Sequence, residues 1–318
     1  MILASAQRPQ SMYERVRRYF LDPAGAQVAL EFSSVALVAA RVEAVRGKLE
    51  LRALASEPLS PGAFEPRLDD PGFAHREELH EVAKRVLTRV GATKDARTAI
   101  VVPDVVARFR LFAQEEVQAD PKKRDEVVAF RMQKLLPFLP ADTRVVTAWP
   151  KSVVDPVLGI GFSSSVLAAY EQAGHAFGLD VGSVETSSMA LLRAIPVEGD
   201  VLLVRHDPTW LTLTLTRNGW PVAIRSFDAS VASRQEEVRR EMSSTATFWR
   251  DRLKGERLHS AFVHASDDWL DSLTRDVNTV FGSMPQRIQP PAGLTVAGVP
   301  ASVERSAAPA LALLSAGS

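Results

Sequence analysis

Residues 28–56 read VALEFSSVALVAARVEAVRGKLELRALAS, and this stretch decides the fold. Apolar runs of strand length are separated by two short breaks, Ser33-Ser34 and Arg46-Gly47-Lys48. Apolar runs of this length, joined by small or glycine-bearing turns, are typical of antiparallel strands. The stretch therefore predicts three consecutive antiparallel strands.

A second stretch, residues 201–227, has the same pattern and reads VLLVRHDPTWLTLTLTRNGWPVAIRSF. Asn-Gly between two apolar runs, here Asn218-Gly219, is the strongest short signal for a hairpin. Each stretch is followed by a helical pattern, a strand and a further helix. The first half has a helix at 75–90 and a strand at 98–102; the second has helices at 231–253 and 267–280 around a strand at 259–263. A fold-level duplication is the most economical explanation.

The first half contains a segment without a counterpart, residues 104–162, which we interpret as an inserted subdomain. A helix at 186–195 is expected to cross to the second half. The tail 301–314 is expected to be helical, although Pro309 near its middle argues against a helix there. The expected organisation is an N-terminal extension (1–25), a first lobe (26–195) with its insertion, and a second lobe (196–318). Within the insertion the sequence predicts a strand at 105–113, a helix at 121–136 and strands at 143–149 and 157–162.

Composition excludes several classes of protein. The chain has 318 residues with 46% hydrophobic content, which is enough for a large core. Lys plus Arg equals Asp plus Glu, at 38 each, so a nucleic-acid binder is not indicated. The absence of cysteine excludes disulfides and thiolate chemistry. The longest apolar runs are too short for a membrane span or a secretory signal, so we expect a cytoplasmic protein.

The segment 11–21 is amphipathic and basic. Met12, Val16, Tyr19 and Phe20 fall near one helical face, with three arginines around it. A helix of this kind can lie on an anionic membrane surface. It can equally dock on its own protein, which is the interpretation we favour.

The usual catalytic motifs are incomplete. The six histidines lack metal-ligand spacing. Gly159-Ile160-Gly161 has no third glycine for a dinucleotide fingerprint. The serines at 163–165 lack the glycines of a nucleophile elbow.

A duplicated fold of this kind places a ligand between its halves, facing the turn between the first two strands of each half. A triphosphate there would need small residues, whose backbone N–H groups can approach the phosphates, and a carboxylate for magnesium. The first turn offers Glu31, Ser33 and Ser34, and the second offers Arg205, Asp207 and Thr209, but neither contains glycine. Pro208 in the second turn has no N–H to donate.

Four stretches, in order, resemble the PilM family of type IV pilus assembly proteins, within the actin-like ATPase superfamily. Leu30 to Ser34 stand where that family has its Asp-Ile-Gly-Ser-Ser phosphate hairpin. The other three stretches are 55–63 (ASEPLSPGA), 128–138 (VAFRMQKLLPF) and 184–193 (VETSSMALLR). The resemblance covers about residues 26–316. It implies an α/β fold: a duplicated, actin-like (ribonuclease H-like) bilobal fold with a small subdomain inserted in the first lobe.

The chain departs from the family pattern at the nucleotide. Glu31 replaces the family aspartate, and Ser33, Asp207 and Ala265 stand at glycine positions. The adenosine-side turn is His264-Ala265-Ser266. We therefore expect a degenerate cleft. Its residues are Glu31, Ser33, Ser34, Arg205, Asp207, Thr209, His264 and Ser266, and neither a cofactor nor a metal is expected there, although ATP with magnesium is what the family binds.

The resemblance implies a scaffold peripheral to the inner membrane, which binds the cytoplasmic tail of a PilN-like bitopic membrane protein and contacts the pilus motor or platform. The groove for that tail would lie between the insertion and the first lobe, with Leu135, Leu136, Pro137, Phe138 and Leu139 as candidate contacts. A working actin-like ATPase is one alternative. The cytoplasmic actin-like component of a type II secretion platform is another.

Overall fold

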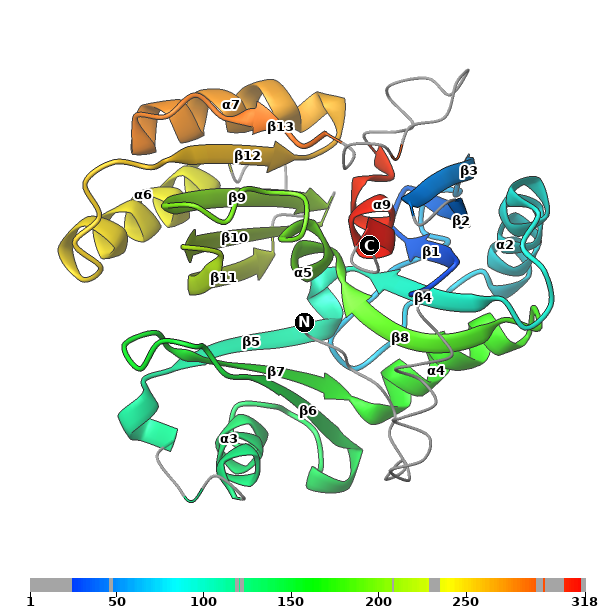
Figure 1. Ribbon diagram of the computed structural model, residues 1–318, viewed down its shortest axis with the longest axis horizontal. Coiled ribbons are helices and arrows are strands. Elements are labelled where there is room, and N and C mark those ends of the chain that lie inside the picture. Colours follow the sequence, from blue (N-terminus) through cyan, green and yellow to red (C-terminus); the bar gives the residue numbers. More distant parts are fainter. Residues whose placement is uncertain are drawn as a thin grey trace.

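The computed structural model describes residues 25–45, 48–117, 120, 123–207, 209–228, 235–289, 294 and 306–315. The amphipathic segment 11–21 and almost all of the predicted N-terminal extension lie outside this description. The described chain forms two lobes, each with a sheet at its centre, and an insertion with a smaller sheet (Figure 1). No helix within these ranges combines the length and the apolar character needed to cross a membrane.

The first lobe is built on a five-stranded sheet of order β3-β2-β1-β4-β8. The predicted three-strand stretch forms its antiparallel part, and the two later strands run parallel to β1. Helices α2 and α4 pack on one face. The elements are β1 (Val28–Phe32), β2 (Ala36–Val45), β3 (Lys48–Pro58), α2 (Arg76–Val90), β4 (Arg97–Val102), α4 (Ser164–His175) and β8 (Asp180–Thr186).

The second lobe repeats this plan with the order β11-β10-β9-β12-β13, so the predicted duplication and bilobal α/β fold are confirmed. Its first three strands are again antiparallel, and β12 is parallel to β9. The elements are β9 (Asp200–Asp207), β10 (Trp210–Arg217), β11 (Trp220–Asp228), α6 (Gln235–Asp251), β12 (Ser260–His264), α7 (Asp267–Phe281) and β13 (Gln286–Arg287).

The hairpin between β10 and β11 turns at Asn218-Gly219, as the sequence predicts. Both residues have positive φ, 49° and 77°. This is the backbone of a type I′ turn, whose twist matches that of the strands it joins. Asparagine and glycine are the residues that adopt it with least strain.

The insertion is a three-stranded antiparallel sheet of order β5-β7-β6 with one helix. Its elements are β5 (Ala107–Phe112), α3 (Arg124–Gln133), β6 (Thr143–Ala148) and β7 (Val157–Ser163), with 3₁₀ turns at Asp104–Val106, Gln114–Val117 and Pro140–Asp142. The predicted strand 105–113 is therefore shorter. Asp104 initiates a turn instead, because its buried carboxylate accepts hydrogen bonds from the N–H and the hydroxyl of Ser188, which lies in the short helix Ser187–Leu191.

Two short helices lie where the lobes meet: α5 (Ser187–Leu191) and α9 (Ala308–Ser315). Figure 1 shows α9 between β1 of the first lobe and the second lobe. Its apolar side chains join both cores: Leu311 packs with the first-lobe sheet and Ala308 packs with Leu203 of β9. The helix begins at Ala308, so Pro309 falls in its first turn, where no intrahelical N–H is needed. The objection to a helix here is thereby removed.

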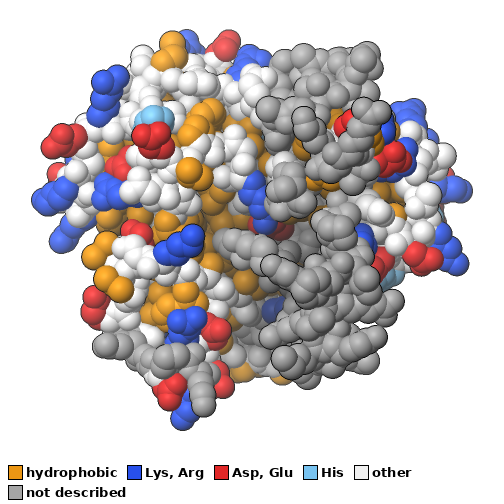
Figure 2. Space-filling model, viewed as in Figure 1, with side chains coloured by type: hydrophobic (Ala, Val, Ile, Leu, Met, Phe, Trp, Pro, Cys, Tyr) orange, Lys and Arg blue, Asp and Glu red, His pale blue; other side chains and the backbone are white. Residues whose placement is uncertain are grey.

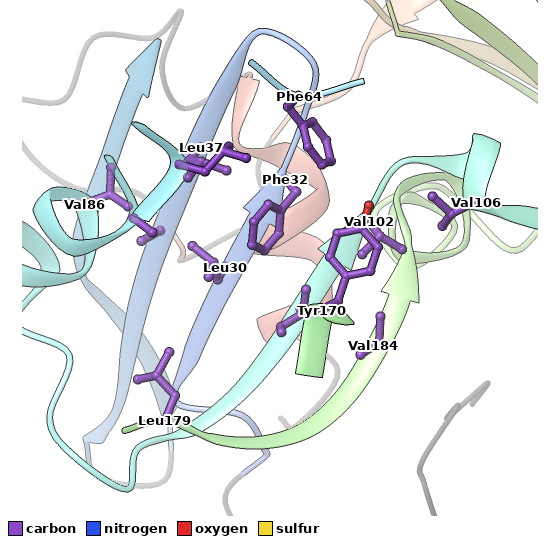
Figure 3. Packing of buried hydrophobic residues seen from close by; sticks show 14 of the residues in the cluster. Leu30, Phe32, Leu37, Phe64, Val86, Val102, Val106, Tyr170, Leu179 and Val184 are labelled. Carbon is purple, nitrogen blue, oxygen red and sulfur yellow. The ribbon is translucent and has the colours of Figure 1, made fainter. Parts of the chain in front are cut away.

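The largest hydrophobic cluster lies between the first-lobe sheet and helices α2 and α4 (Figure 3). Strand β1 follows a period of two: Leu30 and Phe32 face this cluster, and Ala29 faces α9. Phe32 and Tyr170 meet edge to face with ring centroids 5.4 Å apart. This packing fixes the end of β1 and therefore the turn that follows it.

The insertion also leans on the second lobe. Hydrophobic side chains gather along the boundary between them in Figure 2, where β5 runs beside β11. Phe109 and Leu111 of β5 and Trp220 and Ile224 of β11 are partly buried against one cluster. The indole N–H of Trp220 donates to the Pro156 carbonyl at 2.8 Å. The insertion thus contacts both lobes.

Candidate functional site

The turns that follow β1 and β9 meet across the boundary between the lobes. The Ser34 hydroxyl donates a hydrogen bond to Oδ1 of Asp207. Asp207 is buried, with 7% of its surface exposed. The two hairpins therefore contact each other directly, through side chains, at the place where the sequence analysis expects a ligand.

Arg205 lies beside the other oxygen of that carboxylate, and within the described residues neither that oxygen nor Nε of Arg205 has a hydrogen-bond partner. Its Nη2 lies 3.7 Å from Oδ2 of Asp207, and its Nη1 donates to the carbonyl of His206. Arg205 is also 7% exposed. A guanidinium and a carboxylate that are both removed from water attract each other far more strongly than a surface pair does, and separating them leaves two buried charges without partners.

Glu31, at the family aspartate position, is 2% exposed and turns toward the C-terminal helix. Its Oε2 accepts a hydrogen bond from the backbone N–H of Ala310 at 3.2 Å, in the first turn of α9. Burial raises the pKa of Glu31 to about 8; the Arg205 charge and the Ala310 hydrogen bond lower it, and Asp207 raises it further. A protonated Glu31 leaves Arg205 and Asp207 as a balanced pair of charges.

His206, between those two residues on β9, was not predicted as a site residue. It is 1% exposed and stacks on Trp269, with ring centroids 4.3 Å apart. Neither ring nitrogen has a hydrogen-bond partner within the described part of the chain. Burial, and then the Arg205 charge, lowers its pKa to about 3, so the ring is neutral. In the sequence, the apolar run 201–204 was the one feature indicating that the residues of β9, including His206, are buried.

The first turn uses its own N–H groups. The N–H of Ser33 donates to the Ala36 carbonyl at 3.1 Å, and the N–H of Ala36 donates to the Ser33 hydroxyl at 3.1 Å. Ser33 thus stabilises its own turn through hydrogen bonds with Ala36. In the family pattern, this position is a glycine whose amide is free to bind phosphate.

These residues do not fit a magnesium-bound triphosphate. The carboxylate of Asp207 already occupies the gap between the two turns and would repel a phosphate. Glu31 is directed to α9 and is poorly placed to hold a hydrated metal. Among the residues that the structure describes, no group of acidic and histidine side chains could hold a metal ion.

The adenosine-side turn adjoins the second hairpin and lines a different cavity. His264 ends β12 and pairs in register with Arg205, and Ser266 is the residue before α7. Both line a small cavity of about 110 Å³ that also includes Arg287 and Ile288. The structure thus brings Glu31, Ser34, Arg205 and Asp207 together and leaves His264 and Ser266 on a neighbouring cavity.

A larger cavity, of about 630 Å³, opens on the other side of the two hairpins. Thr209 lines it, and so does Ser34. Its wall comes from three parts of the chain: the loop after β3 (Phe64 to Asp69), the start of the insertion (Val105, Arg108) and the second lobe (Trp210, Asp228). This cavity combines aromatic and aliphatic surface with charges of both signs.

The predicted contact segment 135–139 follows the helix of the insertion, which ends at Gln133, earlier than the predicted 136. Leu135 and Leu139 are 53% and 77% exposed, Pro137 is exposed and Phe138 is half-buried. Leu136 is 8% exposed and packs over Gly161, where an added methyl group would come within 2.6 Å of its Cδ1. Leu136 therefore belongs to the interior of the insertion, and the surface is carried by its neighbours.

No family model and no curated protein matches this chain. Solved structures do. The chain is similar to one in the "PilM-PilN type IV pilus biogenesis complex", with a TM-score of 0.75 and 18% identity over 93% of this chain and 99% of that one. It is also similar to a Bacteroides thetaiotaomicron protein with an actin-like ATPase fold and unknown function, with a TM-score of 0.50 and 9% identity over 83% and 91%.

A third similar structure is the cytoplasmic domain of Epsl, an inner membrane component of the type II secretion system of Vibrio cholerae, with a TM-score of 0.46 and 13% identity over 79% and 94%. The first two similarities, at these identities, show the fold. The chain has the actin-like fold that its sequence predicts.

Proposed function

We propose that this protein is a non-catalytic actin-like scaffold of a type IV pilus assembly complex, which binds the cytoplasmic tail of a PilN-like bitopic membrane protein. The likeness to a chain of the PilM-PilN complex over nearly the whole of both chains supports this function. On this proposal the protein lies at the inner membrane through its partner, and it connects that partner to the pilus motor or platform.

One observation carries the non-catalytic part of the proposal: the Ser34–Asp207 hydrogen bond across the lobes. A phosphate-binding cleft needs unoccupied N–H donors and a net positive field. Here the facing turns bond to each other, and a carboxylate points into the gap. Each lost charge-assisted hydrogen bond to phosphate is worth about 1.5–3 kcal/mol. Losing two would weaken ATP binding by roughly 10²- to 10⁴-fold.

The cavity at the junction of the first lobe, the insertion and the second lobe is the proposed site for the tail. In the insertion sheet, Ala107 of β5 pairs with Phe162, and Thr143 of β6 pairs with Ser163. The start of β5, which borders the cavity, and the start of β6, which follows the segment 135–139, therefore lie at the same end of the sheet. On this proposal the tail also contacts the segment 135–139, with Leu135, Phe138 and Leu139 as apolar anchors.

The test is titration calorimetry with two ligands, Mg-ATP and a synthetic peptide of the cytoplasmic tail of the pilus membrane protein from the same genome. We expect the peptide to bind and Mg-ATP to give no heat. Low-micromolar Mg-ATP binding would overturn the non-catalytic assignment and favour a working ATPase. If the tail peptide gives no more heat than a scrambled peptide of the same composition, the proposed scaffold function is wrong.

A further inference from the structure

The 630 Å³ cavity and the facing hairpins share residues. Ser34 lines the cavity and also donates across the lobes to Asp207. Trp210 lines the cavity too, and it pairs in register with Asp207 at the beginning of β10. The second-lobe wall of the cavity therefore includes the strand partner of the residue that the first lobe contacts.

The second-lobe side of the contact that joins the hairpins is buried, whereas Ser34 is half-buried. Asp207 and Arg205 are both 7% exposed, and Nη2 of the arginine lies 3.7 Å from Oδ2 of Asp207. If the lobes moved apart at this point, Asp207 would lose the Ser34 hydroxyl and keep only its partner at 3.7 Å. A buried carboxylate that loses a donor favours the arrangement that restores it.

A second contact, between Trp220 of β11 and Pro156 of the insertion, lies at the other side of the same boundary. The insertion therefore stays with the second lobe at that contact, and the first lobe is joined to the second at Ser34. With both contacts in place, the three walls of the cavity are fixed relative to one another.

We infer that Ser34, Asp207 and Arg205 form an internal latch, which holds the two lobes at the spacing that forms the cavity, in the place where a ligand would otherwise bridge them. Arg205 does not line the cavity; it is a positioning residue that orients the Asp207 carboxylate. The consequence for partner affinity rests on the proposed function: a tail that binds the closed cavity must bind more weakly when the latch is open.

Paired cysteines test the latch directly, because the chain contains no cysteine of its own. In the full chain, the double substitution Ser34→Cys and Asp207→Cys replaces the hydrogen bond by a disulfide, which can be formed by oxidation and broken by reduction. The matched control is Thr212→Cys with Ser226→Cys, because those hydroxyls lie 3.1 Å apart on adjacent strands within one lobe. Disulfide formation is followed by mass spectrometry, and binding of the tail peptide is measured in oxidised and reduced samples.

We expect the interlobe pair to oxidise about as fast as the control pair. The oxidised protein should bind the peptide like wild type, and the reduced one roughly tenfold or more weakly, within the usual range of coupling between sites. Oxidation of the interlobe pair more than about tenfold slower than the control overturns the latch. Equal affinity in the oxidised and reduced states overturns its link to the cavity.

The outcomes separate this inference from the function on which it rests. If the wild-type protein does not bind the tail peptide at all, the proposed function fails, and the rates of oxidation alone decide whether the latch exists. If wild type binds and the reduced interlobe pair binds equally well, the function stands and the latch does not govern it.

Discussion

At the scale of single residues, the cleft is a buried group of ionisable side chains. Glu31, Arg205 and Asp207 are each less than a tenth exposed, and each is directed at another protein group. In a nucleotide-binding relative, residues at these turns would serve a ligand. Here they contact other groups of the protein, and the raised pKa of Glu31 should therefore appear in the stability of the protein.

Glu31→Gln should change the pH dependence of unfolding. The native pKa of Glu31 is about 8, against an ordinary 4.5, so its stabilising contribution is complete below pH 4.5 and is lost as the pH rises through 8. Between pH 6.5 and 8, wild type should lose about 1.4 kcal/mol per pH unit relative to the variant, roughly 2 kcal/mol in all. The glutamine oxygen still accepts from Ala310.

The measurement is denaturant unfolding of both proteins across that range. Other titrating groups are common to both and cancel in the difference. Parallel stability profiles for wild type and Glu31→Gln would mean that Glu31 is ionised in the native protein.

His206→Phe should not lower the melting temperature. The substitution keeps an aromatic ring against Trp269 and removes two buried nitrogens that lack partners in the described residues. The native pKa of His206 is about 3 against 6.5, so the stability contributed by the neutral ring is lost as the pH falls from 6.5 toward 3. The variant should therefore also resist acid better than wild type.

Thermal unfolding at pH 7 and pH 5 checks both parts. A melting temperature lower by more than about 5 °C at pH 7, or an unchanged difference between the two pH values, would show that the imidazole makes a polar contact that phenylalanine cannot replace.

At the scale of elements, the end of α3 separates interior from surface within four residues. Leu136 packs over Gly161, whereas Leu139 is 77% exposed. The helix stops at Gln133, and the irregular chain that follows turns alternate side chains inward and outward. The same type of residue therefore has opposite roles at two neighbouring positions.

Leu139→Ala and Leu136→Ala form a matched pair. Leu139→Ala should leave the free energy of unfolding within about 0.5 kcal/mol of wild type. It should also weaken tail-peptide binding about tenfold or more, if Leu139 is an anchor. Leu136→Ala should cost about 2–5 kcal/mol of stability through the cavity it leaves. Phe138→Ala, at a half-buried position, should cost on the order of 2 kcal/mol of binding if it is a hot spot.

Chemical unfolding and peptide titration on the same preparations decide between the two roles. Normal peptide binding by Leu139→Ala would move the anchors away from this segment and leave the cavity at the lobe junction as the binding surface.

At the scale of the whole molecule, the lobes are joined at α9, at the Ser34–Asp207 contact and along the boundary of β5 with β11. These contacts join the lobes directly, and on the proposed function they do so without a nucleotide.

Mg-ATP at 1 mM should therefore leave the melting temperature unchanged within about 1 °C. A ligand with a low-micromolar dissociation constant would add about 3 kcal/mol at that concentration, which is a shift of several degrees for a protein of this size. The control is magnesium sulfate at matched ionic strength. If ATP raises the melting temperature by several degrees and the magnesium sulfate control does not, the proposal that the protein is non-catalytic is contradicted.

The sequence alone determined the duplicated plan, because the spacing of apolar residues is a local property. Residues 28–56 and 201–227 read as the strands they are, and Asn218-Gly219 marked its turn through backbone preference. The missing glycines at Ser33 and Asp207 were also visible. The relation between those two turns was not, because it joins Ser34 to a residue 173 positions away, and only packing of the two lobes brings them together. Glu31 likewise has the carboxylate of a possible metal ligand, but the group that it contacts is the N–H of Ala310, 279 positions away in the chain. The tertiary structure decided those partners, since burial sets the strength of each contact and the protonation of each group.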